Sequence, residues 1–306
     1  MSAGLRFGYG TNGFADHRLA DACEVIADLG YSGVALTLDH HHLDPYAGDL
    51  ARRVTELADR LRDLGLAVVI ETGARYLLDP WRKHVPTLLH DERRTRLDFL
   101  RGAVAIGADL GAEAVSFWAG VRPDGMDERV AWERLVDGCA RLVEAAEAAG
   151  PPLGFEPEPG MLVETIAGWR RLREALGAPA VFGLTLDIGH CRCVEPEPVA
   201  ACVTAVAEHL VNVQIDDMRR GVHEHLEFGD GEIDFPPVLR ALGDAGYRGL
   251  VAVELPRHSH AAPVVAARSL DFLRTAEKRA AEGRAVEKRA AQGKAAEEKP
   301  AGRREP

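Results

Sequence analysis

Short apolar runs alternate with longer amphipathic stretches along most of the chain. The runs are rich in Val, Ile, Leu and Phe and almost continuously apolar, which is typical of parallel strands covered on both faces. These predicted strands span residues 6–10, 33–38, 67–71, 114–118, 153–156, 182–187, 210–215 and 250–254. The stretches between them place apolar residues three and four positions apart, which indicates amphipathic helices. The helices are expected at residues 18–29, 50–64, 92–110, 128–149, 163–176, 196–208, 235–245 and 263–276.

Strands that alternate with helices in this number predict an α/β fold, a single (β/α)8 TIM barrel over residues 1–277. A doubly wound open sheet is the alternative, and it usually carries a glycine-rich phosphate loop after its first strand. Gly8, Gly10 and Gly13 match the spacing of that loop literally. The first two glycines would lie inside the predicted strand, however, so the barrel is the preferred fold.

Residues 278–306 differ from the rest of the chain in composition. They consist mainly of Ala, Glu, Lys and Arg, and the stretch 277–283 nearly recurs at 287–293. A segment with almost no large apolar side chains cannot bury a core of its own. We therefore expect a charged C-terminal tail that is disordered or forms a frayed helix.

Composition and charge narrow the class of function. The chain has 306 residues, of which 46% are hydrophobic, and its net charge is −11. Because an acidic surface repels phosphate backbones, no nucleic-acid partner is expected. No apolar run approaches the roughly 20 residues that span a bilayer, and the N-terminus lacks a secretory signal pattern, so no membrane partner is expected. The five scattered cysteines do not form a disulfide framework, which predicts a reducing, cytoplasmic location.

Four oxygen-bearing side chains stand at the ends of successive predicted strands. Glu156, Asp187, Gln214 and Glu254 close the fifth, sixth, seventh and eighth strands in turn. The carboxyl ends of barrel strands meet at one mouth, where three crowded carboxylates repel one another unless a cation binds. Oxygen ligands suit a hard divalent ion such as Mn²⁺ or Mg²⁺, with Co²⁺ or Zn²⁺ as alternatives. The sequence therefore predicts one divalent metal ion held by these residues.

The same positions resemble the xylose isomerase-like TIM barrel superfamily, which includes ketose 3-epimerases, hydroxypyruvate isomerase, inosose dehydratase and endonuclease IV-type enzymes. The resemblance covers about residues 5–275, and its motifs are Gly154-Phe155-Glu156-Pro157, Leu186-Asp187-Ile188-Gly189-His190, Val213-Gln214-Ile215-Asp216-Asp217, Gly229-Asp230-Gly231-Glu232-Ile233-Asp234-Phe235 and Val253-Glu254. It implies that Glu156, Asp187, Gln214 and Glu254 bind the metal. It further implies that Glu156 and Glu254 are the catalytic acid and base, and that His190 hydrogen-bonds a substrate oxygen.

The resemblance implies a reaction mechanism. A divalent ion polarises a carbonyl and so acidifies the adjacent C–H bond. One carboxylate removes that proton to give a metal-stabilised enediolate, and a carboxyl group returns it. The predicted protein is thus a metal-dependent isomerase or epimerase of a small sugar, keto sugar or cyclitol. Three alternatives stay open: a dehydratase of an inosose-like substrate, an endonuclease IV-like zinc phosphodiesterase, and a barrel that binds a polyol without catalysis. A homo-oligomer is also open.

Other residues are candidates for binding a polyol or keto-sugar substrate. His225 falls where isomerases and epimerases of the superfamily place a substrate-binding Arg, and His223 lies beside it. In the phosphodiesterase alternative this pair would hold an extra zinc ion. Glu71 and Trp118, however, close the third and fourth strands, where that class would need further His ligands. In the isomerase interpretation Glu71 could contact the substrate, and Trp118 could line an apolar wall beside a sugar ring. Arg75 and Lys83 follow the third strand and could meet a substrate carboxylate or phosphate.

One acidic residue competes with a predicted ligand. Glu158 lies two positions after Glu156, in the stretch Glu156-Pro157-Glu158-Pro159. Strand alternation places Glu156 in register, whereas Glu158 falls in a loop restricted by proline. The sequence therefore favours Glu156 as the ligand.

Overall fold

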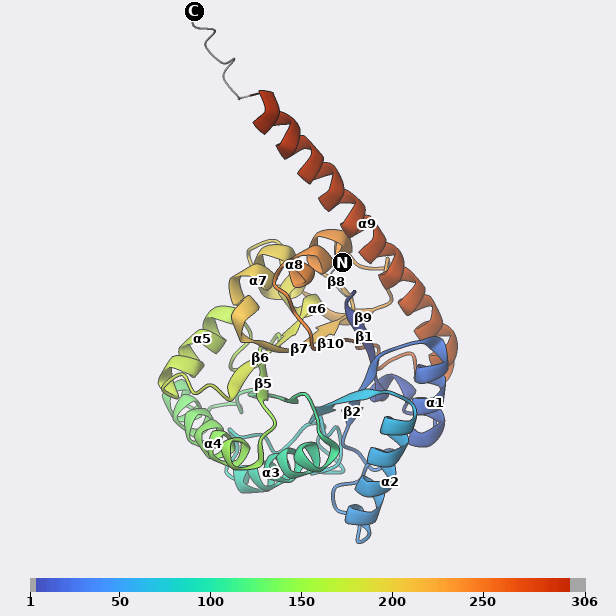
Figure 1. The fold of residues 1–306 in the computed structure, drawn as a ribbon. Helices are drawn as coiled ribbons and strands as arrows, with labels where there is room; N and C mark the ends of the chain where they lie inside the picture. Colours follow the sequence, from blue (N-terminus) through green and yellow to red (C-terminus); the bar gives the residue numbers. More distant parts are fainter. Residues whose placement is uncertain (1–3, 298–306) are drawn as a thin grey trace, which may run out of the picture.

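A computed structural model describes residues 4–297 as a closed barrel of parallel strands surrounded by helices (Figure 1). Around the barrel the strands follow the order β1-β10-β7-β6-β5-β4-β3-β2. Their bounds are β1 Arg6–Gly10, β2 Gly33–Thr37, β3 Ala67–Glu71, β4 Val115–Trp118, β5 Leu153–Glu156, β6 Phe182–Asp187, β7 Leu210–Ile215 and β10 Leu250–Val253. Each strand lies within one residue of its predicted bounds, which confirms the predicted TIM barrel.

The helices of the outer layer lie where they were predicted, and all but the fifth, sixth and eighth predicted helices lie within one residue of their predicted bounds. They are α1 Leu19–Leu29, α2 Leu50–Asp63, α3 Arg93–Leu110, α4 Glu128–Ala149, α5 Ile166–Ala175, α7 Val199–Val206, α8 Phe235–Asp244 and α9 Ala262–Glu297, with short 3₁₀ turns η1 Thr11–Phe14, η2 Ala207–His209 and η3 Ser259–Ala261. Helix α5 begins later than predicted because the Thr165 hydroxyl accepts the Gly168 N–H at 3.1 Å and caps the helix there.

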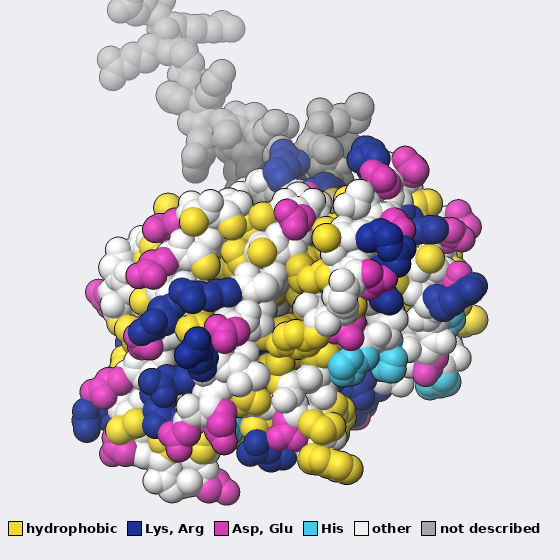
Figure 2. Space-filling model, turned by 90° about the horizontal axis from the view of Figure 1, so that it is seen from below, with side chains coloured by type: hydrophobic (Ala, Val, Ile, Leu, Met, Phe, Trp, Pro, Cys, Tyr) yellow, Lys and Arg dark blue, Asp and Glu magenta, His cyan; other side chains and the backbone are white. Residues whose placement is uncertain are grey.

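Figure 2 views the molecule from below and shows acidic and basic side chains interspersed on that face.

One helix and a two-stranded hairpin were not predicted. Helix α6, Ile188–Val194, follows β6 without a loop, because the Asp187 side chain caps it by accepting the His190 N–H at 2.7 Å. Strands β8, Asp217–Arg219, and β9, Val222–Leu226, form an antiparallel hairpin between β7 and α8. The hairpin sequence is mostly polar, so it carries no apolar run to reveal it. Both strands of this hairpin pack against α6.

The core has two apolar layers. The larger layer fills the space between the strands and the helices, and a smaller cluster contains Val69, Ala114 and Leu250. A Cβ atom on Gly33 of β2 would lie 2.6 Å from the Leu250 side chain of β10, although β1 separates these strands. The two residues therefore meet inside the barrel, which excludes a larger side chain at position 33.

Helix α9 crosses the predicted boundary between barrel and tail. It runs without a break from Ala262 to Glu297 along α8 and α1 (Figure 1). Ala280 is buried, and Arg284 forms an ion pair with Asp244 of α8 at 2.5 Å. Residues 278–297 are thus helical, and their first turns pack on the barrel, whereas the rest of the predicted tail, 298–306, lies outside the described residues. Among residues 4–297, no helix combines the length and apolarity needed to cross a membrane.

Candidate active site

A cavity of about 420 Å³ opens at the carboxyl ends of the barrel strands. Of the residues selected from the sequence, ten line it: Glu71, Arg75, Lys83, Trp118, Glu156, His190, Gln214, His223, His225 and Glu254. The eleventh, Asp187, is buried at the base of α6, next to His190. The structure therefore brings the predicted residues to one mouth, and only Asp187 lies beneath its surface.

The four strand-end oxygen residues occupy adjacent positions around the barrel. In barrel order they lie on β5, β6, β7 and directly after β10. Asp187 is paired in register with Gln214, and Gln214 with Ala252 of β10. Glu254 continues the ladder, because its N–H donates to Ile215 O at 3.2 Å. The set thus forms an arc in which Asp187 and Gln214 lie between the two glutamates.

Two oxygens within this arc are buried without a donor. Asp187 Oδ1 accepts the His190 N–H, but Asp187 Oδ2 and Gln214 Oε1 have no hydrogen-bond partner among the described residues. Glu254 differs, because its Oε1 accepts a hydrogen bond from Asn12 Nδ2 at 2.9 Å. Buried acceptors are almost always satisfied, so two orphan oxygens side by side need an explanation. A divalent cation among these oxygens would supply it, and the donor set fits a hard ion.

The acidic groups at the mouth also carry unfavourable charge. Burial raises the pKa of Glu71 and Glu156 well above the usual range, and the charge of Glu254 raises both further. Burial, followed by Glu254, raises the pKa of Glu158 to about 8. Asn212 Nδ2 donates to Glu71 Oε1 at 3.2 Å and offsets only part of this effect. A cation at the mouth would relieve the repulsion among these carboxylates.

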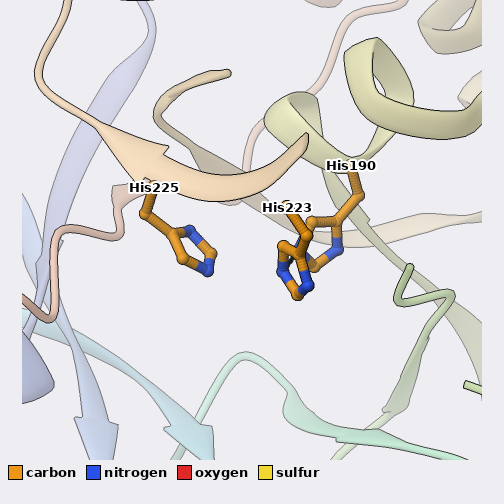
Figure 3. Close-up of side chains that lie close together, drawn as sticks. All are labelled: His190, His223 and His225. Atoms are coloured by element: carbon orange, nitrogen blue, oxygen red, sulfur yellow. Dashed lines mark hydrogen bonds between the residues drawn. The ribbon is translucent and has the colours of Figure 1, made fainter. Parts of the chain in front are cut away.

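Three histidines gather on one side of the cavity. His190 comes from α6, and His223 and His225 come from β9 (Figure 3). Nε2 of His190 and Nε2 of His223 lie 3.0 Å apart, and His190 Nδ1 lies 3.2 Å from Pro157 O. One ring nitrogen from each histidine could reach a common metal ion, since these atoms all lie within 4.8 Å of one another. The structure thus offers nitrogen ligands directly beside the oxygen arc.

The charges of these histidines differ. Burial lowers the pKa of His190 to about 4 and that of His223 to about 4, so both rings are neutral near neutral pH. Burial would also lower the pKa of His225, but the carboxylate of Asp216, which forms an ion pair with His225 Nδ1, raises it to about 10. His225 is therefore a cation, held in place by a fully buried carboxylate.

Some residues at the site were missed or set aside in the sequence. Glu158, which the proline pattern placed in a loop and which was not chosen as the ligand, lines the cavity together with Glu156. Asn12 and Asp216 were not selected; the signal for Asp216 was its spacing, two residues after Gln214 along the same strand end. His40–His42, a polar run after β2, do not line the cavity.

Trp118 forms one wall of the cavity. Its ring lies 5.4 Å from that of His84, centroid to centroid, and the Arg96 guanidinium lies 4.2 Å from its ring centroid. Arg96 is buried behind this wall, with Nη1 and Nη2 unpaired among the described residues. Cation–π contacts of this kind hold an aromatic ring in one orientation.

Comparisons with known proteins agree with this architecture. L-ribulose-5-phosphate 3-epimerase UlaE of Shigella flexneri serotype 5b is 25% identical over 234 residues, which cover 72% of this chain and 80% of that protein. Inosose dehydratase of Geobacillus kaustophilus is 31% identical over 140 residues, only 40% of this chain and 45% of the dehydratase. A solved structure of L-ribulose 3-epimerase has the same fold, with a TM-score of 0.72 and 22% identity over 97% of this chain and all of that one. A family described as xylose isomerase-like TIM barrel matches residues 23–276. Since this match covers most of the sequence, the chain belongs to the xylose isomerase-like TIM barrel family.

Proposed function

We propose that this protein is an isomerase or epimerase of a small sugar, keto sugar or cyclitol and that it depends on one divalent metal ion. The observation that carries the proposal is the pair of orphan buried oxygens, Asp187 Oδ2 and Gln214 Oε1, between two glutamates at the barrel mouth. The epimerase relative that matches most of the chain supports the same reaction class.

The residues that would hold the ion are Glu156, Asp187, Gln214 and Glu254. When bound, a divalent ion of the Mn²⁺ or Mg²⁺ type polarises a carbonyl and neutralises negative charge that develops on its oxygen. Asp187 and Gln214 are rigid, since both belong to barrel strands and are almost fully buried. Asp187 and Gln214 would bind the ion and take no part in proton transfer.

Glu156 and Glu254 would move the protons. They stand at the two ends of the arc of ligands, so their carboxyl groups approach a substrate from two sides. One removes the proton from the carbon next to the carbonyl, and the other returns a proton to the opposite face or to the neighbouring carbon. The first outcome is epimerisation and the second is isomerisation. Neutral His190 and cationic His225 line the same cavity and can hydrogen-bond substrate oxygens.

The test is proton–deuterium exchange into a panel of ketoses and inososes in D₂O, with and without Mn²⁺. We expect Glu254→Gln to lower the exchange rate by about 100-fold or more even at an Mn²⁺ concentration that restores full metal occupancy. Glu208→Gln, an exposed substitution on η2, is the matched control and should leave the rate unaltered. Full exchange by Glu254→Gln with metal bound would overturn the acid–base assignment. If EDTA changed neither exchange nor melting temperature, metal dependence would be wrong.

Dehydration is a second candidate, favoured by the inosose dehydratase relative. Loss of a β-hydroxyl after the same C–H cleavage would yield a product lighter by one water molecule. An epimerase or isomerase gives products of unchanged mass. Mass spectrometry of the products from the same panel therefore separates the two reactions.

A further inference from the structure

Two exposed basic side chains, Arg75 and Lys83, lie at the rim of the cavity. Arg75 and Lys83 both line it from the loop between β3 and α3, and their side chains make no hydrogen bond or ion pair with another described residue. The third basic residue of the lining, Arg257, donates to Glu224 at 2.5 Å and is neutralised. Asp79, which lies in the same loop as the two free cations, is also satisfied, since it pairs with Arg82 at 2.7 Å. Arg75 and Lys83 are therefore available to an anion.

The backbone of the loop brings the two basic residues towards each other. His84 N–H donates to Arg75 O at 2.6 Å, which closes the segment and brings Lys83 back towards Arg75. Ala74 and His84, near the two ends of the segment, have φ angles of +49° and +66°. Non-glycine residues keep such conformations only where their surroundings enforce them, often at functional sites. The contact of the His84 ring with Trp118 supplies part of that enforcement.

The rest of the mouth has the opposite charge. Its lining includes Glu71, Glu156, Glu158 and Glu254. In barrel order β3, which leads into the Arg75–Lys83 loop, lies diametrically across from β7, which carries Gln214. The two unpaired cations thus lie on the side of the cavity that faces Gln214, beyond Glu71 at the end of β3.

We propose that the substrate carries an anionic group, a phosphate monoester or a carboxylate, at the end remote from its reacting carbons, and that Arg75 and Lys83 bind this group. The proposal rests on the proposed function and specifies its substrate class. The carboxylates would repel an anion elsewhere in the mouth, so the two cations fix which end of the substrate faces Asp187 and Gln214. Arg75 offers a planar fork for two anionic oxygens and Lys83 a point charge.

The experiment compares a ketopentose, its 5-phosphate and a ketohexuronate as substrates of the Mn²⁺-loaded full-length protein. Exchange kinetics in D₂O and direct calorimetric binding are measured for wild type, Lys83→Met and Arg75→Gln. We expect each substitution to raise KM and Kd for the anionic substrate about tenfold or more, because a charge-assisted hydrogen bond is lost. The values for the neutral ketopentose should stay within about twofold. Arg129→Gln, an exposed substitution on α4, is the matched control.

The two charged compounds identify the source of the anion. Tighter binding of the 5-phosphate than of the ketohexuronate assigns a phosphate, and the reverse order assigns a carboxylate. Equal affinity for charged and neutral sugars, unchanged by both variants, would overturn the inference even if exchange is observed. If no sugar exchanges a proton but the anionic sugars bind and lose affinity in Lys83→Met, the anion site stands and the proposed function fails. A fall in Mn²⁺ affinity as the sole effect of both variants would show that the cations only balance the acidic mouth, and would also refute the inference.

Discussion

Asp187→Asn should stabilise the protein without metal and destabilise it relative to wild type when metal is present. The substitution keeps the size of the side chain and the oxygen that caps α6, since Asn is as good an N-cap as Asp. It removes one of the buried negative charges. Because the capping oxygen is kept, the amide nitrogen takes the place of Asp187 Oδ2, one of the two orphan oxygens. The sign of the stability change should therefore depend on the cation.

The magnitude follows from the spacing of the charges. Carboxylate oxygens of Glu156 and Asp187 lie within 4.8 Å of each other. Where both groups are ionised, two unit charges at that separation repel by roughly 3 kcal/mol at an effective dielectric constant of about 20. Removing one charge recovers up to that amount, which corresponds to a melting temperature about 6 °C higher for a chain of this size. For wild type, Mn²⁺ at 100 times its Kd should add about 2.7 kcal/mol, and the variant should lose most of this gain.

Thermal unfolding in EDTA and in excess Mn²⁺ tests both signs. Asp127→Asn is the control, because Asp127 also caps a helix, α4, but is exposed and remote from the mouth. It should change stability by less than about 0.5 kcal/mol in either buffer. If Asp187→Asn is less stable than wild type in EDTA as well as in Mn²⁺, the buried charges are not repelling one another and the reasoning fails.

Two further predictions concern stability away from the metal ligands. Arg96→Met should leave the free energy of unfolding equal or higher, because the buried guanidinium has no hydrogen-bond partner among the described residues and burial lowers its pKa to about 9. Urea unfolding measures this free energy, and Arg94→Met, an exposed substitution on the same helix, is the control. A loss above about 2 kcal/mol would instead show that the contact with Trp118 outweighs the cost of burial. A chain ending at Glu277 should be less stable by about 1–2 kcal/mol, because it loses the buried Ala280 and the Arg284–Asp244 pair. An unchanged urea midpoint would mean that α9 contributes nothing beyond residue 277.

The barrel could be predicted because its strands are buried on both faces. Such strands appear as continuous apolar runs, and the helices between them carry a regular apolar stripe, so order and number follow from the pattern alone. Helix α6 was not predicted because it is short and follows β6 directly. One side-chain hydrogen bond, rather than an apolar stripe, sets its start. The β8–β9 hairpin was not predicted because it is held mainly by polar contacts. Asp217, for instance, accepts the N–H groups of Met218, Gly229 and Ile233.

The candidate site was predictable to the extent that it lies at strand ends. Glu156, Gln214 and Glu254 share one mouth because each closes a strand, and parallel strands of a barrel end at the same rim. Glu158 and the availability of Lys83 could not be read in the same way, since both depend on how loops return to the barrel. Whether a charge is paired is decided by tertiary neighbours, and no local pattern in the sequence records that.

The β8–β9 hairpin contributes side chains to the cavity without belonging to the barrel sheet. Its two strands pair with each other and not with the barrel sheet, yet His223 and His225 reach the cavity from it. Replacing its residues would remodel the cavity while every hydrogen-bonded barrel strand keeps its partners. Substitutions at His223 and His225 of β9 would therefore change the cavity lining without breaking a hydrogen bond of the barrel, whereas Asp217 of β8, which accepts three backbone N–H groups, has to be kept.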